Sequence, residues 1–201
     1  MDKKVLLCSK FIESNESIID LEKNYTHIRA YHGCSTKNVE NYYKYGILPI
    51  NKNFAKKQAL ELLIDDRTSS ETVLRVFNEH WKEFDIVHRS VWFSLLRQEL
   101  IKYSGHYLIY GSEFITNMAA ELYCLDKLKE KGQPTIFHCD VPIQQIPAHF
   151  FDSIKEKLKI GDIKNCGFKI EDNLSPEEIV KHDTPKLVYD PLNGLRTCYY
   201  S

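Results

Sequence analysis

The sequence predicts an α+β domain, and three observations support that prediction. Short runs of strand-forming residues are mixed with helical patterns, without the regular βαβ alternation of a doubly wound sheet. Hydrophobic residues make up 43% of the 201 positions, which is enough for a sizeable core. The chain contains no internal repeat and no Gly/Ser linker. We therefore expect one domain over 1–201, with a helical insertion at about 54–84.

The first quarter of the chain is expected to hold two strands and two helices. Residues 5–8 form a short apolar run that fits an edge strand, and 14–22 have helical spacing. Residues 28–32 alternate as a short strand does. A helix is expected over 35–45, because Gly46 follows as a C-terminal glycine would.

The middle of the chain is predicted to be largely helical. Helices are expected over 54–65 and over 69–81, where apolar residues recur on one side. They separate two strand-like regions, so we interpret them as an insertion or lid. Residues 86–96 resemble a strand at their start, and 95–103 fit a further helix.

Strands and helices alternate irregularly in the remainder. The composition of 107–110 (YLIY) predicts a buried strand, and the 3.6-residue period after it predicts a long helix over 113–130. Ser175 is expected to cap a turn in which Pro176 is the first helical residue. Further strands are expected at 134–141, 167–170, 186–189 and 195–200, with a short helix at 154–158.

Charge and cysteine content narrow the functional class. The formal net charge of −1 provides no basic field over the whole surface, so any contact with nucleic acid has to come from a local patch. The six cysteines show no C-x-x-C pair and no zinc-finger spacing, which favours free thiols in a reducing compartment. The N-terminal apolar run is too short for a signal peptide, and no stretch reaches the ~18–20 apolar residues of a membrane span. We expect a soluble, cytoplasmic protein without a membrane contact.

The familiar catalytic signatures are missing from the sequence, including G-x-G-x-x-G, the P-loop, H-E-x-x-H and G-x-S-x-G. Candidate sites therefore come from less specific groups, of which the first is Tyr31-His32-Gly33. At the end of a strand, an imidazole can hydrogen-bond a sugar hydroxyl, and a glycine lets a flat amide pair with the backbone. The structural alternative is a partly buried histidine with a satisfied hydrogen bond.

A second group lies in HYLIYGSEF, which covers 106–114. If this segment is a strand, Tyr107 and Tyr110 point to opposite faces, so that one packs in the core and the other can stack on a ligand ring. Ser112 is a suitable helix cap. Glu113 is then either a catalytic candidate or an acidic residue favoured in the first helical turn by the helix dipole.

A third group is GFKIE, which ends at Glu171. A carboxylate at a strand end can orient a nucleophile or stabilise an oxocarbenium-like centre. The alternative is an ordinary solvated turn, since the sequence continues with Asp172 and Asn173.

The order of these pieces resembles the ADP-ribosyltransferase fold, specifically the His-Tyr-Glu branch that includes diphtheria-type toxins and the poly-ADP-ribose polymerases. The strongest part of the resemblance is YHGCSTKNVENYYKYGILP, which looks like that branch's Tyr-His-Gly-(Thr/Ser) strand with its helix and Gly-Ile/Leu turn. An aromatic-Ser strand follows in VWFS at 91–94, or alternatively in YLIYGS at 107–112. The implied fold is a split β-sheet core.

The resemblance also implies roles for particular residues. His32 would hold the nicotinamide ribose of NAD, and the Gly33 backbone would pair with the carboxamide. The stacking tyrosine of the family falls on Tyr110, since VWFS lacks a tyrosine. The NAD-binding residues expected in this way are Tyr31, His32, Gly33, Tyr107 and Ser112.

The catalytic glutamate of the family usually comes from a late strand. GFKIEDNLSPEEI resembles that strand and the Pro-containing turn after it, but Gly167 or Phe168 stands where the glutamate is expected. Glu171 is then the late candidate and Glu113 the alternative. A catalytically altered member of the family is a third reading.

The implied activity is that of an NAD-dependent ADP-ribosyltransferase, which cleaves the nicotinamide-ribose bond and needs no metal. NAD would be the co-substrate, and the target a protein or a nucleic acid. A bacterial or phage-related toxin or defence effector is the expected setting, with an antitoxin or regulatory partner. Two alternatives remain: an RNA 2′-phosphotransferase of the same fold, with Arg29, Arg89 and Arg97 around the phosphate, and a non-catalytic module that binds NAD or another nucleotide.

Overall fold

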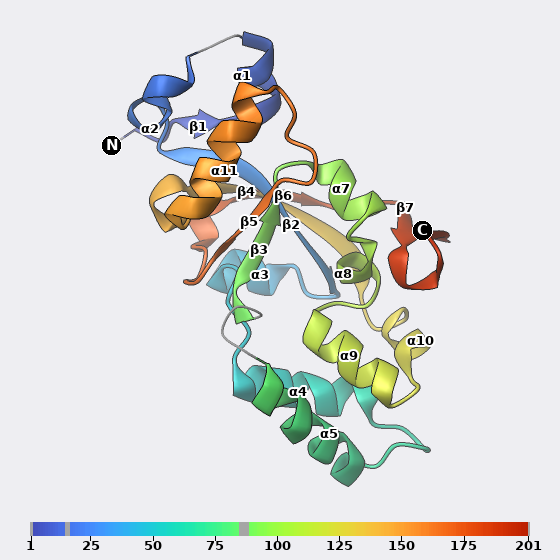
Figure 1. The fold of residues 1–201 in the computed structure, drawn as a ribbon. Helices are drawn as coiled ribbons and strands as arrows, with labels where there is room; N and C mark the ends of the chain where they lie inside the picture. The colour runs from blue at the N-terminus through green and yellow to red at the C-terminus, as the bar shows by residue number, and fades with distance from the viewer. Residues whose placement is uncertain (1, 15–16, 85–88, 201) are drawn as a thin grey trace.

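The computed structural model describes residues 2–14, 17–84 and 89–200, and it has the α+β architecture that the sequence predicts. At its centre lies a six-stranded, mostly antiparallel sheet with the order β5-β3-β2-β4-β6, in which the short β1 pairs in parallel with β2 (Figure 1). A hairpin of two further strands lies near the C-terminus. The strands are β1 (Val5–Leu6), β2 (His27–Thr36), β3 (Val91–Ser94), β4 (Gln133–Pro142), β5 (Gly167–Ile170), β6 (Ile179–Asp183), β7 (Leu187–Asp190) and β8 (Arg196–Tyr199).

Helices cover both faces of the sheet. Figure 1 shows α1, α2 and α11 gathered on one side, and α7 to α10 on the other, with α4 and α5 beyond α9. Within the described residues, no helix has both the length and the apolar composition needed to cross a membrane. The helices are α1 (Cys8–Ser14), α2 (Leu21–Asn24), α3 (Glu40–Tyr45), α4 (Lys52–Leu63), α5 (Ser70–Glu83), α7 (Arg97–Lys102), α8 (Gly105–Ile109), α9 (Glu113–Glu121), α10 (Leu125–Leu128) and α11 (Ala148–Lys159).

The register of β2 against β4 decides which side chains share a face. Ala30 is opposite Cys139 and His32 is opposite Phe137, so these side chains project to the face that α1 and α11 cover. Tyr31 and Gly33 project to the other face, which α7 to α10 cover. Each face has its own buried apolar cluster.

The strand β2 is longer than the sequence suggests. Ser35 and Thr36 pair with β4, so they extend the strand. The helix predicted over 35–45 therefore begins only at Glu40, as α3. Gly46 ends α3 with a positive φ of 82°, as a C-terminal glycine is expected to do, and a Cβ there would lie 2.0 Å from the Leu174 carbonyl oxygen.

The two helices predicted in the insertion are confirmed as α4 and α5. Asn51 and Ser69 cap them by accepting hydrogen bonds from Phe54 N (2.9 Å) and Thr72 N (3.2 Å). The apolar sides of both helices are buried together with α9. This helical layer forms one boundary of the cavity that contains the candidate site.

The prediction of a strand over 107–110 is wrong, because these residues belong to α8 and its end. Tyr, Leu and Ile suit a buried strand by composition, but tertiary packing decides here. Gly105 brings α8 so close to β7 that a Cβ would lie 1.9 Å from the Tyr189 carbonyl oxygen. This close contact of helix and strand requires a glycine at position 105.

Other predicted boundaries also change. The long helix over 113–130 is broken after α9, since Tyr123 has a positive φ of 53°, and α10 follows as a separate short helix. Of the helix predicted over 14–22, positions 15 and 16 lie outside the described residues. The rest is divided among the end of α1, a 3-10 turn over Ile18–Asp20 and the start of α2. In the segment 86–96, the first three positions lie outside the described residues, and β3 begins at Val91. The short helix at 154–158 is the second half of the longer α11.

Candidate functional site

A cavity of about 790 Å³ lies where the sheet meets the helical layer. Its wall includes the end of β2, the strand β3, the start of β5, the loop after α3, Tyr107 of α8 and the start of α9. A volume of this size is typical of sites for cofactors and other small molecules. His32, Gly33, Tyr107, Ser112 and Glu113, all singled out by the sequence, line this cavity.

His32 is held in one tautomer by the neighbouring strand. Its Nδ1 lies 2.9 Å from the carbonyl oxygen of Trp92. Because a carbonyl oxygen only accepts, Nδ1 carries the proton and Nε2 of the neutral ring keeps its lone pair. Burial lowers the pKa of His32 below its usual value, although the Trp92 carbonyl acts in the opposite direction. The ring is therefore neutral near pH 7, and Nε2 is able to accept a hydrogen bond from a hydroxyl group.

Gly33 lies next to His32 and contributes bare backbone to the cavity wall. A Cβ at this position would lie 3.1 Å from Leu108 Cδ2 and 3.4 Å from Leu100 Cδ2. The close approach of α7 and α8 is thus one physical reason for glycine here. The second reason, backbone pairing with a flat amide, is compatible with the same geometry.

Tyr107 and Glu113 form a pair at the helical side of the cavity. The Tyr107 hydroxyl donates to Glu113 Oε1 at 2.5 Å, and burial together with this contact raises the pKa of Tyr107. Ser112 caps α9 by accepting a hydrogen bond from Ile115 N, which places Glu113 in the first turn of the helix. The carboxylate is thus fixed by a side chain, a cap and the helix dipole together.

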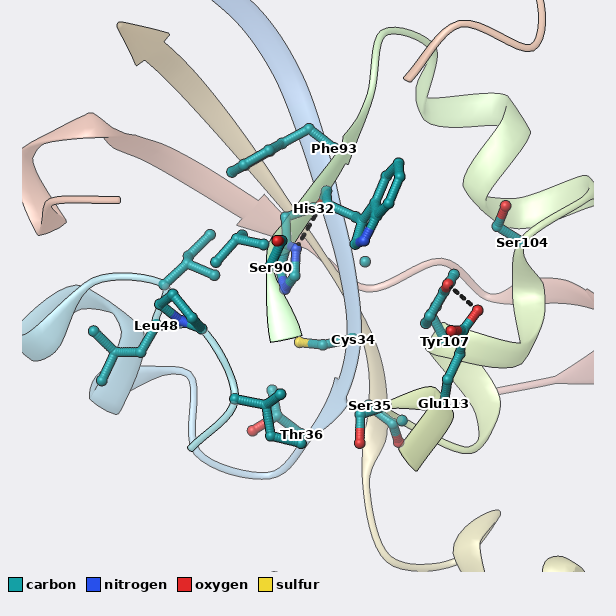
Figure 2. A pocket seen from close by; sticks show the side chains of 18 of the residues that line it. His32, Cys34, Ser35, Thr36, Leu48, Ser90, Phe93, Ser104, Tyr107 and Glu113 are labelled. Atoms are coloured by element: carbon teal, nitrogen blue, oxygen red, sulfur yellow. Dashed lines mark hydrogen bonds between the residues drawn. The ribbon is translucent and has the colours of Figure 1, made fainter. Parts of the chain in front are cut away.

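Figure 2 shows two groups of side chains on either side of β2. His32, Ser90 and Leu48 form one group, and Ser104 with the hydrogen-bonded pair Tyr107–Glu113 forms the other. This division agrees with the register, because His32 projects to the face opposite that of Gly33. Both groups line the same cavity, whose wall therefore holds an imidazole, bare backbone and a carboxylate.

Three predicted site residues are not found in this wall. Tyr31 points to the opposite face from His32 and packs edge-on against the His138 ring at 4.9 Å. Tyr110 is only 3% exposed, and its hydroxyl donates to Asp190 Oδ2 at 2.5 Å. Glu171 has a side chain that is 67% exposed and forms an ion pair of 3.6 Å with Lys169. Tyr110 is therefore a buried core residue, and Glu171 is a residue of a solvated turn.

The structure adds one carboxylate that the sequence did not single out. Glu99 lines the cavity from the first turn of α7, where its Oε1 accepts from Asn165 N at 2.5 Å and its Oε2 from Ser94 Oγ at 3.4 Å. It thus lies at the start of β5, close to the position where the resemblance leads one to expect a glutamate. In the sequence, its only signal is its place in the helix that follows the aromatic-Ser strand VWFS.

The remaining wall limits the chemistry of the cavity. Burial raises the pKa of the Cys34 thiol to about 12, so Cys34 is not a thiolate nucleophile near neutral pH. The described residues of the wall include neither lysine nor arginine. Nowhere among the described residues do three or more histidine, cysteine, aspartate or glutamate side chains form a group that could hold a metal ion. The polar chemistry of the wall thus comes mainly from an imidazole, carboxylates, hydroxyls, amides and backbone.

Comparisons of this chain with protein-family models, with curated proteins and with solved structures gave no match. Its function is therefore inferred from the site residues and from the sequence motifs.

Proposed function

We propose that this protein is an NAD-dependent ADP-ribosyltransferase that transfers ADP-ribose to a macromolecular acceptor. The observation that carries the proposal is the neutral imidazole of His32 lining the same cavity as the carboxylate of Glu113. The resemblance of YHGCSTKNVENYYKYGILP to the His-Tyr-Glu branch supplies the identity of the co-substrate. The described geometry supports the proposal by giving His32 a free acceptor nitrogen.

In this proposal, each group has a defined task. Nε2 of His32 accepts a hydrogen bond from a ribose hydroxyl, and the Gly33 backbone pairs with the nicotinamide carboxamide. The bond between ribose C1′ and the pyridinium nitrogen breaks, and its electron pair neutralises the departing nicotinamide. The Glu113 carboxylate stabilises the positive charge that develops at C1′, as carboxylates do at other glycosidic centres.

Glu113 is the best placed of the three candidate carboxylates. Glu171 lies outside the cavity wall, and both oxygens of Glu99 accept hydrogen bonds. Glu113 accepts from Tyr107 through Oε1, the same oxygen that lies 4.0 Å from His106 Nε2, and its side chain is 46% exposed. A carboxylate that is held by one oxygen and accessible at the other is suited to charge stabilisation.

The proposal is tested by nicotinamide release from NAD, measured by chromatography. Glu113→Gln should lower the rate by about 10²–10³-fold, the range for removal of one electrostatic stabiliser. His32→Ala should weaken turnover by about 2- to 12-fold, as expected for removal of a hydrogen bond of ~0.5–1.5 kcal/mol. Glu171→Gln is the matched control and should leave the rate unchanged.

Two results would contradict this assignment. If Glu99→Gln abolishes release while Glu113→Gln does not, the catalytic carboxylate is Glu99. If the wild-type protein binds NAD in calorimetry but releases no nicotinamide with any lysate acceptor, the protein is a non-catalytic binding module.

The phosphotransferase alternative has less support. Arg29 pairs with Asp140 at 2.5 Å, and Arg97 forms a bidentate pair with Asp183. The guanidinium of Arg89 lies over the Trp81 ring. None of the three arginines lines the cavity, so the described residues provide no arginine cluster for a 2′-phosphate.

A further inference from the structure

Five of the side chains that line the cavity are apolar and exposed, and we call them the rim. They are Tyr45, Leu48, Phe54, Trp92 and Tyr103, and each is 42% to 59% exposed. They come from α3, the loop after it, α4, β3 and the segment between α7 and α8. Four of the five are aromatic, so the rim presents several flat surfaces to solvent, although the Trp92 ring also packs edge-on against Phe150 at 5.9 Å.

A second hollow of about 290 Å³ adjoins the cavity and shares part of its wall. Seven residues line both, namely Ser35, Thr36, Asn41, Phe54, Gln58, Gly111 and Ser112. The hollow differs in charge, because its wall carries three lysines and one glutamate. These charged residues are Lys37, Lys57, Lys131 and Glu61.

The lysines of the hollow differ in how they are paired. Lys57 lies 3.7 Å from Glu61, whereas Lys37 and Lys131 form no ion pair with another residue in the described part of the chain. Both of these side chains are exposed. They therefore provide two uncompensated positive charges beside a cavity that contains carboxylates.

Lysine also accompanies the aromatic rim. Lys44 Nζ lies 5.0 Å from the centroid of the Tyr45 ring, and Lys102 Nζ lies 5.2 Å from that of Tyr103. Flat rings interleaved with cations are the features by which proteins bind single-stranded nucleic acid: the bases stack on the rings and the phosphates contact the cations.

We propose that the acceptor is a single-stranded nucleic acid, with bases stacked on the aromatic rim and backbone phosphates at Lys37 and Lys131. This inference rests on the proposed function, because it names the substrate class of the same site. It also reconciles a formal net charge of −1 with a polyanionic partner, since the positive charge is local. Unstacked bases are required, so a duplex is a poorer ligand.

The proposed transfer of ADP-ribose to a base conserves atoms and electrons. The C1′–N bond of NAD breaks and nicotinamide leaves with the electron pair. A nitrogen or oxygen of an unpaired base forms the new bond to C1′. The proton that this atom loses is taken up by the Glu113 carboxylate or by solvent, and no oxidant or reductant is needed.

Binding is measured without NAD, by fluorescence anisotropy of short labelled single strands of RNA and of DNA. We expect saturable binding that weakens with salt for at least one of the two. Lys37→Ala/Lys131→Ala should weaken binding and reduce the slope of log K against log salt by about 1.4, which is ~0.7 for each phosphate that is no longer neutralised. Lys10→Ala/Lys181→Ala, which removes two exposed lysines outside both hollows, should leave the slope unchanged.

The rim is tested separately, at a residue that does not line the second hollow. Tyr103→Ala should weaken single-strand binding by about 5- to 150-fold, the effect of losing one stacked base. Tyr199→Ala is the control, because Tyr199 is an exposed aromatic residue of β8 that lies outside both hollows. Circular dichroism of each variant confirms that it is folded.

The possible outcomes separate the two proposals. Nicotinamide release with no single-strand binding, or label from NAD found on protein alone, would overturn the nucleic-acid acceptor and leave the enzyme assignment intact. If the Lys37→Ala/Lys131→Ala variant differs from the wild type only in the KM for NAD, the hollow binds the NAD diphosphate, and the nucleic-acid acceptor is again overturned. Single-strand binding without nicotinamide release in the presence of the strand would overturn the enzyme assignment instead.

Discussion

Replacement of Tyr110 with phenylalanine should destabilise the fold and leave the proposed chemistry in place. The Tyr110 hydroxyl donates to Asp190 Oδ2 at 2.5 Å, and the Asp190 side chain is only 1% exposed. Asp190 also accepts from Leu192 N at 3.1 Å and from Asn193 Nδ2 at 2.8 Å. The tyrosine thus helps to satisfy a buried carboxylate between α8 and the C-terminal hairpin.

The magnitude follows from this geometry. A hydrogen bond to a charged group contributes about 1.5–3 kcal/mol. Two other donors to Asp190 remain in the variant, so we take a value near the lower end, about 2 kcal/mol. A protein of this length loses ~2–4 °C in Tm per kcal/mol, and the expected fall in Tm is about 4–8 °C.

Thermal unfolding followed by circular dichroism measures the change in Tm, and nicotinamide release is then compared at a temperature where both proteins are folded. The wild-type rate should persist, because Tyr110 lines the second hollow but not the cavity of the proposed NAD site. An unchanged Tm would refute the structural role. A folded variant without turnover would return Tyr110 to the site, where the resemblance to the His-Tyr-Glu branch puts it.

Three further predictions concern other parts of the site and fold. Tyr107→Phe should lower kcat for nicotinamide release about tenfold, which is ~1.4 kcal/mol, with little change in the KM for NAD; a tenfold rise in the KM alone would indicate a binding role. Burial lowers the pKa of His32 below 6.5, so as the pH falls the unfolded chain takes up a proton before the folded one does. The free energy of unfolding in urea should therefore fall as the pH drops below 6.5, and His32→Gln should make this pH dependence weaker. An unchanged pH dependence in the variant would contradict the prediction. Gly105→Ala should lower the free energy of unfolding by about 1–3 kcal/mol, because the added Cβ would lie 1.9 Å from the Tyr189 carbonyl oxygen. If the variant unfolds at the same denaturant concentration as the wild type, α8 is able to move away from β7.

The sequence predicts those elements whose signals are local. The helices α4 and α5 have caps at Asn51 and Ser69 and a clear apolar period, and β4 and β5 are compact apolar runs close to their predicted bounds. The strand predicted over 107–110 is wrong because the composition of this segment suits a strand and a buried helix equally. Its state is decided by the contact of Gly105 with β7, which is more than eighty residues away in the chain and leaves no local signature.

The site shows the same limit. His32, Gly33 and Glu113 can be singled out because each is next to a recognisable feature, namely a strand end, a backbone approach or a helix cap. Glu99 cannot, because its place in the site depends on β3 and β5 being neighbours, which brings Asn165 within 2.5 Å of its carboxylate. The preference for Tyr110 over Tyr107 depends on an assumed strand, and the helical conformation of α8 instead directs Tyr107 to the cavity.

Glu113 has two explanations, and one substitution separates them. In the first turn of α9 a negative charge interacts favourably with the helix dipole by about 0.3–1 kcal/mol, which is sufficient reason for a glutamate there. Glu113→Gln removes the charge but keeps an amide oxygen that can accept from Tyr107, and it leaves the Ser112 cap in place. If the dipole is the only reason, unfolding free energy should fall by this small amount and nicotinamide release should not change. If the carboxylate acts on the substrate, the same small loss of stability should accompany a rate lowered by about 10²–10³-fold, because a neutral amide cannot stabilise positive charge at C1′.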